Sequence, residues 1–286
     1  MPARRDSTGV PAPLMVLAAA SSVQFGAAIA VTLFDNLGPA GASALRVGLG
    51  AVILLAVWRP SVRGLPKADL RLVGALGLTL GVMNYAFYEA LDRIPLGIAV
   101  TIEFAGPLGV AVALSRRRLD LVWVALAAAG ILLLADPSGG SLDPVGLVLI
   151  GVAAAAWAAY ILLVARAGER FTGGRGLALA MGVAALVPLG PGIAEAGADL
   201  LKPEFLGIGA AVALLSSVIP YSLEMEALRR IPRHIFGVLM SLEPALAALG
   251  GFVVLGQSLS GRDLVAIGLV MAASGGATRA APPIDG

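Results

Sequence analysis

The chain has 286 residues, of which 58% are hydrophobic and 13% are charged, and its formal net charge is +2. About a quarter of the residues of a soluble domain are charged, so this composition and the mean hydropathy of +0.92 indicate an integral membrane protein. The sequence has no Cys and a single His, which excludes disulfides, thiolate catalysis and a Cys/His metal cluster. We therefore expect neither a metal nor a cofactor.

Apolar stretches of about 20 residues, the length needed to cross a hydrocarbon core, recur along the whole chain between short polar segments. They predict an all-α integral membrane fold with about ten transmembrane helices. No loop is long enough for a soluble domain, so residues 1–286 are expected to form a single transmembrane domain. The predicted spans are residues 14–34, 42–58, 70–91, 96–114, 121–135, 145–164, 176–189, 205–225, 235–255 and 264–277.

The positions of the cations predict the orientation of the chain, because cytoplasmic loops of membrane proteins are enriched in Lys and Arg. With the N-terminus inside, the outer loops hold only Arg93, Lys202 and Arg262 of the 20 Lys and Arg residues. Arg46 falls inside the second span, and the other cations lie in the inner segments. We therefore expect both termini to be cytoplasmic.

A six-residue motif occurs twice with one difference, as ALDRIP from Ala90 and as ALRRIP from Ala227. An odd number of predicted spans separates the copies, so the first lies outside and the second lies inside. The similarity continues in register and aligns Pro107 with Pro244. Inverted repeats of this kind are common in secondary transporters. We expect two inverted five-helix repeats, about residues 14–135 and 145–277.

Three charged residues lie deep in the predicted spans, namely Arg46, Glu103 and Glu243. A charge at the bilayer centre costs about 2.5–3.5 kcal/mol on insertion scales, which makes these residues functional candidates. The two glutamates approach the middle from opposite sides, and we expect Arg46 to approach Glu103, since both lie in the outer half. The structural alternative is that the glutamates are protonated or pair with Arg46 as contacts between helices.

These groups suit a zwitterionic substrate, which needs both signs of charge to replace its lost hydration. Glu103 or Glu243 would take an ammonium group, while Arg46, Asn84 or a helix N-terminus would take a carboxylate. Each further candidate can equally serve as a bridge between helices. These candidates are Gln24, Tyr85 and Ser241, as partners for a substrate hydroxyl, and Trp157, Tyr160 and Tyr221, as walls or hydrogen-bonding groups.

Motifs of the main membrane-enzyme classes are missing from the sequence. It contains no G-x-x-x-x-G-K-[ST] loop for phosphates and no H-E-x-x-H pair for zinc. The aspartates all lie at span ends or in loops, which leaves no buried aspartyl pair for catalysis. We therefore expect neither an enzyme nor a nucleic-acid partner.

Five long segments carry a family resemblance: SVQFGAAIA (22–30), ALRVGLG (44–50), residues 83–108, WAAYIL (157–162) and residues 220–251. They resemble the drug/metabolite transporter superfamily, EamA type, and within it the bacterial threonine/homoserine exporters. The resemblance implies a bacterial inner-membrane protein with ten helices in two inverted halves. It also implies a central cavity lined mainly by the first, third, fourth, sixth, eighth and ninth spans. One departure is Gln257, which stands where EamA repeats usually carry glutamate.

We therefore expect an inner-membrane secondary transporter that exports small amino acids, such as threonine and homoserine, by alternating access. Its partners would be the amino-acid substrate and the lipid bilayer, and proton coupling through Glu103 or Glu243 is a hypothesis for the energy input. One alternative is an exporter of other amphiphilic metabolites or drugs, which an aromatic content of 5% disfavours. Another is a membrane scaffold without transport, which would have no need of paired deep carboxylates.

Overall fold

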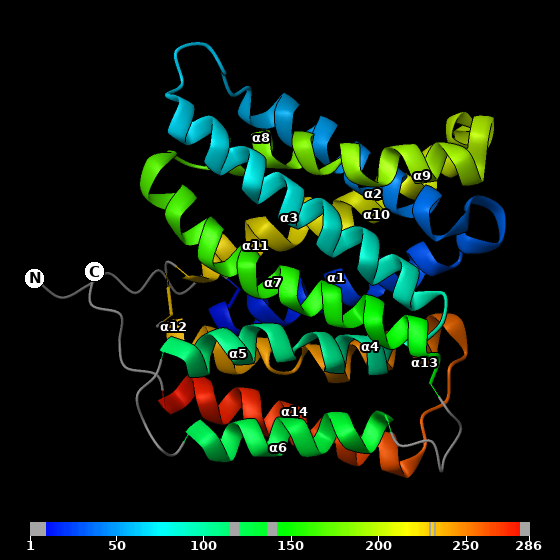
Figure 1. Ribbon diagram of the computed structural model, residues 1–286, viewed down its shortest axis with the longest axis vertical. Helices are drawn as coiled ribbons and strands as arrows, with labels where there is room; N and C mark the ends of the chain where they lie inside the picture. Colours follow the sequence, from blue (N-terminus) through cyan, green and yellow to red (C-terminus); the bar gives the residue numbers. More distant parts are fainter. Residues whose placement is uncertain (1–9, 115–119, 136–141, 229, 232, 281–286) are drawn as a thin grey trace, which may run out of the picture.

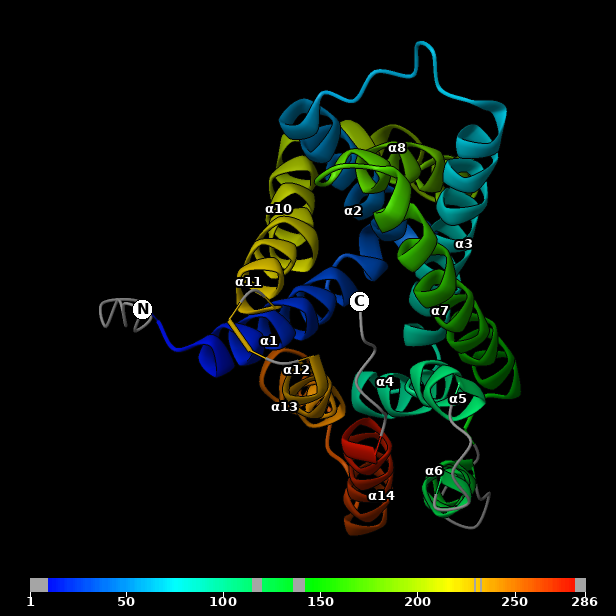
Figure 2. The same ribbon diagram turned by 90° about the vertical axis from the view of Figure 1, so that its left-hand side faces the viewer.

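The computed structural model describes residues 10–114, 120–135, 142–228, 230–231 and 233–280, and every regular element in these segments is a helix. Most helices run across the long axis of the molecule and are stacked along it (Figures 1 and 2). In chain order they are α1 (Ala12–Val31), α2 (Phe34–Trp58), α3 (Lys67–Leu91), α4 (Leu96–Glu103), α5 (Ala105–Leu114), α6 (Asp120–Ala135), α7 (Pro144–Arg170), α8 (Arg175–Ala184), α9 (Leu186–Ala196), the 3-10 helix η2 (Gly197–Leu201), α10 (Pro203–Ala213), the π-helix η3 (Leu214–Val218), α11 (Ile219–Leu228), α12 (Arg233–Met240), α13 (Glu243–Leu255) and α14 (Gly261–Ala280).

Each predicted span coincides with one helix or with consecutive helices, so the all-helical prediction is confirmed. Six stretches of the described residues are long and apolar enough to cross a membrane, by length and composition alone. They are Ala12–Val31, Phe34–Trp58, Lys67–Leu91, Pro144–Arg170, Arg175–Leu201 and Ile235–Leu255. Leu96–Val110, Leu121–Leu134 and Pro203–Val218 are apolar but shorter. The count of ten spans stays a prediction.

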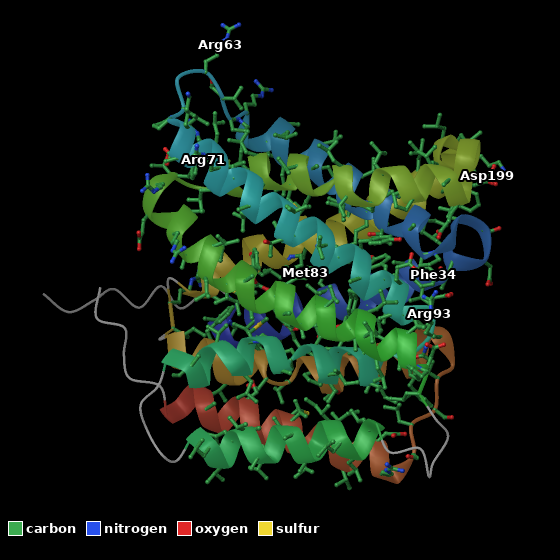
Figure 3. The ribbon with its side chains drawn as sticks, viewed as in Figure 1. Phe34, Arg63, Arg71, Met83, Arg93 and Asp199 are labelled. Atoms are coloured by element: carbon green, nitrogen blue, oxygen red, sulfur yellow. The ribbon has the colours of Figure 1, made fainter. Side chains whose placement is uncertain are left out.

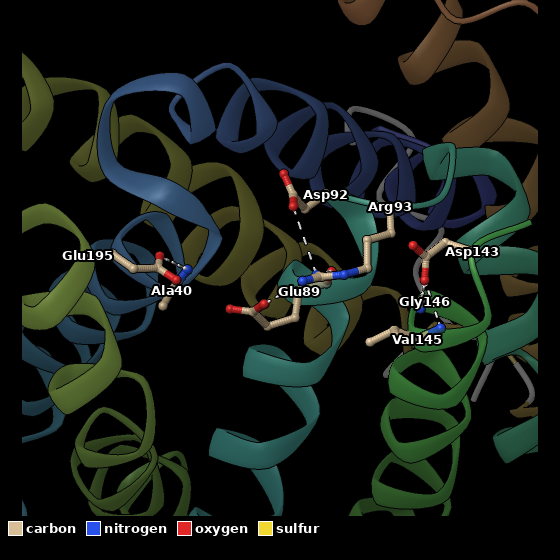
Figure 4. Close-up of polar contacts among 8 residues, drawn as sticks. All are labelled: Ala40, Glu89, Asp92, Arg93, Asp143, Val145, Gly146 and Glu195. Carbon is tan, nitrogen blue, oxygen red and sulfur yellow. Dashed lines mark hydrogen bonds and ion pairs between the residues drawn. The ribbon is translucent and has the colours of Figure 1, made fainter.

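The start of α2 differs from the prediction, because the helix begins at Phe34 rather than at residue 42. The sequence Gly38-Pro39 resembles a loop, but it forms a kink inside the helix, with Gly38 at φ 65°. The second part of α2 therefore has its own N-terminus, where the backbone N–H of Ala40 donates to the Glu195 carboxylate at 2.9 Å (Figure 4). A carboxylate from α9 replaces the intrahelical acceptors that this N–H lacks.

Two spans are interrupted at corresponding points of the chain. α4 gives way to α5 at Phe104, and α12 gives way to α13 at Ser241 and Leu242. Pro107 and Pro244 follow these breaks, and each proline removes a backbone N–H that would bond four residues back. The aligned prolines of the sequence thus coincide with two broken helices.

α1 lies at the centre of the molecule and packs against α11 and α13, while α13 also packs against α4 (Figure 2). The contact of α4 with α13 is close, because a Cβ added at Gly97 would lie 2.8 Å from Ala248 Cα. α6 pairs with α14 at one end of the long axis, and α2, α8 and α9 gather at the other (Figure 1). The broken helices therefore lie between α1 and the pair of α6 and α14 (Figures 1 and 2).

Large apolar side chains are exposed on the outward faces of several helices. A water-soluble surface rarely carries so many, whereas the hydrocarbon core of a bilayer accommodates them, and helices satisfy their own backbone groups there. These residues come from α2, α6, α7, α9, α13 and α14 and include Val52, Val57, Leu121, Leu132, Val148, Leu186, Phe252, Val253, Leu264 and Val265.

The helices run across the long axis, and the two sides of the molecule at which they end carry different charged residues. Figure 3 shows Arg63 and Arg71 on one of these sides, Arg93 and Asp199 on the opposite side, and Met83 between them. The beginning of α1 and the end of α14 lie on the side that carries Arg63 and Arg71 (Figures 1 and 3). Both described ends of the chain thus share one side of the molecule.

Candidate functional site

A cavity of about 230 Å³ lies among α1, α2, α3, α4, α7, η3, α11, α12 and α13. The six spans that the resemblance implied all contribute to it, together with α2. Apolar side chains make up much of the wall, and the titratable or hydrogen-bonding ones come from several helices. Among the predicted residues, the cavity brings together Gln24, Arg46, Asn84, Glu103, Trp157, Tyr160 and Glu243.

Arg46 forms the cationic part of the wall. Its Nη1 donates to Asn84 Oδ1 at 2.5 Å, and its guanidinium lies 5.4 Å from the ring centroid of the fully buried Tyr88. Asn84 is itself held by a bond from Nδ2 to the carbonyl of Leu80. Glu103 lines the same cavity as Arg46, although no ion pair joins the two side chains in the described part of the chain. The amide and the aromatic ring therefore hold the guanidinium in place.

Glu243 and Gln24 form a polar contact between α13 and α1. Gln24 Nε2 donates to Glu243 Oε2 at 3.3 Å, and both side chains are buried. Glu243 is the first residue of α13, where the partial positive charge of a helix N-terminus stabilises a carboxylate. Gln24 Oε1 is buried and has no hydrogen-bond partner within the described part of the chain. An acceptor thus remains beside a fixed carboxylate.

Glu103 lies on another wall of the cavity, at the last residue of α4. The next residue, Phe104, packs edge-on against Trp157 with ring centroids 5.2 Å apart, which fixes the indole as part of the wall. Glu103 is buried, and no hydrogen bond to another described residue holds its carboxylate. The break in α4 therefore places a carboxylate in the cavity without a fixed partner.

Two polar residues of the cavity, Glu224 and Ser216, were missed by the sequence reasoning. Glu224 stands one residue from the end of the predicted span 205–225, whereas α11 continues to Leu228 and places it on the cavity wall. Ser216 is buried in η3. The nearby Pro220 was the one available signal, because a proline inside a span disturbs the helix before it.

Three further candidates have other surroundings. Tyr85 is half-buried on α3 beside Glu89 and does not line the cavity. The Ser241 hydroxyl lies within hydrogen-bonding distance of the Gly237 carbonyl and Ser274 Oγ, at 3.0 Å from each, also away from this cavity. The side chain of Tyr221 lies outside the described residues.

Several polar contacts lie on the side of the molecule that carries Arg93. Arg93 Nη1 lies 3.3 Å from Glu89 Oε2 and 3.9 Å from Asp92 Oδ2, and the Asp143 carboxylate caps the start of α7 (Figure 4). Nearby in the fold, the backbone N–H of Leu96 donates to Gln257 Oε1 at 3.1 Å. Gln257 therefore caps the helix that ends in Glu103.

A second cavity, of about 320 Å³, adjoins the first and shares Trp157 and Met240 with it. Its other lining residues are mostly apolar and include Phe104, Leu108 and Phe236. Its described lining residues add apolar volume and no charged group next to the polar cavity.

Membrane-length helices around an internal cavity with groups of both signs define a membrane transporter of small solutes. The EamA-like transporter family matches residues 144–278. The chain is 43% identical to the threonine/homoserine exporter RhtA of Salmonella typhimurium and to that of Escherichia coli K12, in each case over 93% of this chain and 90% of the relative. This protein therefore belongs to the EamA-like transporter family.

Two more distant similarities were also found, one in sequence and one in fold. The uncharacterized inner membrane transporter YedA of Escherichia coli K12 is 27% identical over 72% of this chain and 69% of its own. One crystal structure superposes with a TM-score of 0.59 at 21% identity, over 94% of this chain and 97% of the other. The fold is therefore one already seen in solved structures.

Proposed function

We propose that this protein is a bacterial inner-membrane exporter of small amino acids, with threonine and homoserine as substrates, and that it works by alternating access. One observation carries the proposal: the cavity presents a guanidinium beside an amide on one wall and carboxylates on others. This arrangement complements a zwitterion. The names of the relatives that are 43% identical over most of the chain support the same substrate class.

In the proposed complex, Arg46 and Asn84 bind the substrate carboxylate. Arg46 uses one nitrogen for Asn84, and its other donors are suited to a carboxylate, which a guanidinium can bind through two parallel bonds. The substrate ammonium binds between Glu243 and Gln24 Oε1, the buried acceptor that lacks a partner in the described chain. A donor group from a ligand would satisfy that oxygen.

Glu103 is the proposed proton carrier of the cycle, with Glu243 as the other candidate. A coupling carboxylate must exchange protons with alternating sides of the membrane, and a group without a fixed hydrogen-bond partner can do so without breaking a structural contact. Glu224 contributes a third carboxylate to the wall of the same cavity. Trp157 and Tyr160 complete the substrate cavity on the α7 side.

The membrane topology is part of the proposal. Ten transmembrane helices would form two inverted five-helix repeats within one domain, and the broken helices α4–α5 and α12–α13 are the corresponding elements that support this pairing. Both termini would be cytoplasmic, since the described chain ends share a side with Arg63 and Arg71 (Figure 3) and cations favour the inner side. A C-terminal reporter that is active only in the periplasm would contradict this orientation.

Cavity size favours amino acids over drugs. Pockets for drug-sized ligands occupy about 300–1,000 Å³, more than the 230 Å³ of the polar cavity. The adjoining apolar cavity of about 320 Å³ is the one feature that favours the alternative, an exporter of other amphiphilic metabolites or drugs, because it offers room for a hydrophobic substituent.

Efflux from proteoliposomes loaded with labelled threonine or homoserine tests the proposal. The wild-type protein should export both, and Glu103→Gln combined with Glu243→Gln should abolish export while the protein still folds and inserts. Glu204→Gln, at an exposed position in the first turn of α10, is the matched control and should export normally. Normal threonine export by the double variant would contradict the site, and stronger competition by hydrophobic cations than by amino acids would favour the drug exporter. Failure to move any solute would favour a scaffold.

A further inference from the structure

The second cavity, of about 320 Å³, lies between two pairs of helices. α5 packs against α7, and α12 packs against α14, and all four helices contribute to the wall. The lining runs from Phe104, at the break between α4 and α5, to Phe236 and Ala277, near the start of α12 and the end of α14. The cavity therefore extends from the helix break toward the side of the molecule that carries Arg63 and Arg71 (Figures 1 and 3).

The wall of this cavity is mostly apolar. Phe104, Leu108 and Ile161 contribute hydrocarbon surface, and the Oγ of Ser274 lies 3.0 Å from Ser241 Oγ, which already provides it with a polar partner. Protein interiors are close-packed and contain few voids larger than a water molecule. Apolar cavities stay dry and take up apolar ligands. A cavity of this size and lining therefore suits an apolar guest better than water.

The surroundings of the cavity indicate which guest is at hand. α7 and α14, which line it, also expose large apolar side chains such as Val148 and Leu264 on their outward faces, as helices in contact with lipid do. Trp157, Phe236 and Met240 border the cavity and are only half-buried. In a bilayer, the apolar molecule at the highest concentration is the lipid acyl chain.

A cation stands at the start of α12, on the face that lines the cavity. Arg233 is the first residue of this helix. It precedes the lining residues Phe236, Gly237 and Met240 by three, four and seven positions, and residues at these spacings share one face of a helix. At 1.5 Å per residue, the start of α12 lies about 5 Å beyond Phe236. The apolar cavity therefore ends close to the level of a cationic residue.

Two further lining helices carry arginine toward the same side. Arg279 is the last but one residue of α14, and the exposed Arg166 lies on α7, five residues after Ile161 of the lining. The end of α14, the end of α7 and the start of α12 share one side of the molecule (Figure 1). The cytoplasmic leaflet carries negative surface charge, and basic pockets between transmembrane helices on that side bind anionic headgroups.

We infer that the second cavity binds an acyl chain of an anionic phospholipid from the cytoplasmic leaflet, and that the cations at the helix ends around Arg233 bind its headgroup. The chain packs behind Trp157 and Met240, which line both cavities, so the lipid completes the wall of the polar cavity. It also fills the space that a hydrophobic substituent of a drug would need. The inference relies on the proposed orientation in the membrane and not on the proposed substrate.

Quenching by brominated lipids tests the inference at the cavity itself. A variant with Trp58→Phe and Trp123→Phe keeps Trp157, on the wall shared by the two cavities, as the single tryptophan of the chain. It is reconstituted in phosphatidylcholine vesicles with a small fraction of brominated phosphatidylglycerol or brominated phosphatidylcholine. Bromine quenches tryptophan only near contact. The brominated phosphatidylglycerol should therefore quench Trp157 more strongly than the brominated phosphatidylcholine does at the same mole fraction.

A cavity-filling variant of this single-tryptophan protein tests the place of the acyl chain. Gly237→Leu adds a side chain to the cavity wall and should remove most of the difference in quenching between the two lipids. The matched control is Gly151→Leu, at an exposed position of α7 where an added Cβ meets nothing within 4 Å. It should keep the difference.

A charge variant tests the headgroup contact. Arg233→Gln should raise the mole fraction of phosphatidylglycerol needed for half-maximal quenching by about fivefold, the contribution of one basic residue near an anionic surface. Arg71→Gln removes an exposed cation from the second turn of α3, on the same side of the molecule but away from this cavity (Figure 3). It should leave that mole fraction nearly unchanged.

Equal quenching by the two lipids would overturn the inference, and so would equal losses in a variant and its matched control. Absence of quenching, together with a change of Trp157 fluorescence on addition of hydrophobic cations, would assign the cavity to a drug-like substituent instead. If the single-tryptophan protein fails to insert, native mass spectrometry of the chain with all its tryptophans counts bound phosphatidylglycerol, and Gly237→Leu should lower that count. Protein that binds the lipid but exports no amino acid would refute the proposed function alone.

Discussion

The two broken helices show how one local rule can give two different carboxylate environments. In both, a proline removes a hydrogen bond and a glutamate stands beside the break. Glu243 opens α13, at a favourable helix N-terminus, and accepts a bond from Gln24. Glu103 closes α4 and has no hydrogen bond to a described residue. Both spans are broken at the corresponding point, but Glu103 stands before its break and Glu243 stands after its own.

This difference distinguishes a carboxylate that is held in place for binding from one that can gain and lose a proton. A carboxylate held by an amide and a helix terminus is preorganised for a substrate cation, whereas one without a fixed partner is free to exchange its proton. The following predictions test this division, from the largest expected effect to the smallest.

Glu243→Gln should lower threonine export by about 10- to 100-fold, since a hydrogen bond to a charged group contributes about 1.5–3 kcal/mol. The loss should appear mainly as a higher KM, because the ammonium loses a ground-state contact. Efflux rates at a series of internal threonine concentrations measure it. An unchanged KM would remove Glu243 from the binding site.

Glu103→Gln should reduce export driven by a pH gradient by about tenfold and leave threonine exchange without a gradient nearly unchanged. The amide keeps the size of the side chain but cannot carry a proton, so it affects coupling rather than binding. Efflux and counterflow measured on the same vesicles distinguish the two processes. Equal loss in both assays would assign Glu103 to substrate binding instead.

Gln24→Ala should lower threonine export by a few-fold, and its effect should depend on Glu243. The two residues are hydrogen-bonded, so a double-mutant cycle should give a coupling energy of about 0.5–3 kcal/mol. The same cycle between Gln24 and Glu103, which line the same cavity without a hydrogen bond between them, should be nearly additive. Strong coupling in the second cycle would show that the two walls are not independent.

Gln257→Ala should have the smallest effect and should change stability rather than specificity. It removes the side-chain acceptor of the Leu96 N–H at the start of α4, a kind of contact that contributes about 0.5–2 kcal/mol. The expected fall in Tm is about 2–4 °C, measured by thermal unfolding in detergent. Gln257→Glu keeps an acceptor at this helix N-terminus and should preserve the Tm.

The sequence predicted most helices of the fold because apolar length is a direct signal of a membrane span. It missed the first turns of α2 because Gly38 and Pro39 have the local chemistry of a loop, and only the carboxylate of Glu195, far along the chain, makes them a kink within a helix. Contacts of this kind depend on the packing of distant helices and leave no local pattern.

The deep charges of the site were also predictable, since each is costly in a bilayer. Their partners were not. Depth alone suggested that Arg46 approaches Glu103, and it gave no indication that the guanidinium bonds Asn84 and lies over Tyr88. Ser216 gave still less signal, because serine is common in apolar helices and the π-turn that contains it has no local sequence pattern.

The close contact of Gly97 with Ala248 has a mechanical consequence for the transport cycle. Gly97 has no side chain to hold the two helices apart, so a larger residue at this position would have to push α4 away from Ala248 of α13. The bond from the Leu96 N–H to Gln257 joins the start of α4 to the segment that follows α13. Because Glu103 and Glu243 lie on these two helices, a proposed transport cycle that kept this contact intact would open the cavity by moving other helices.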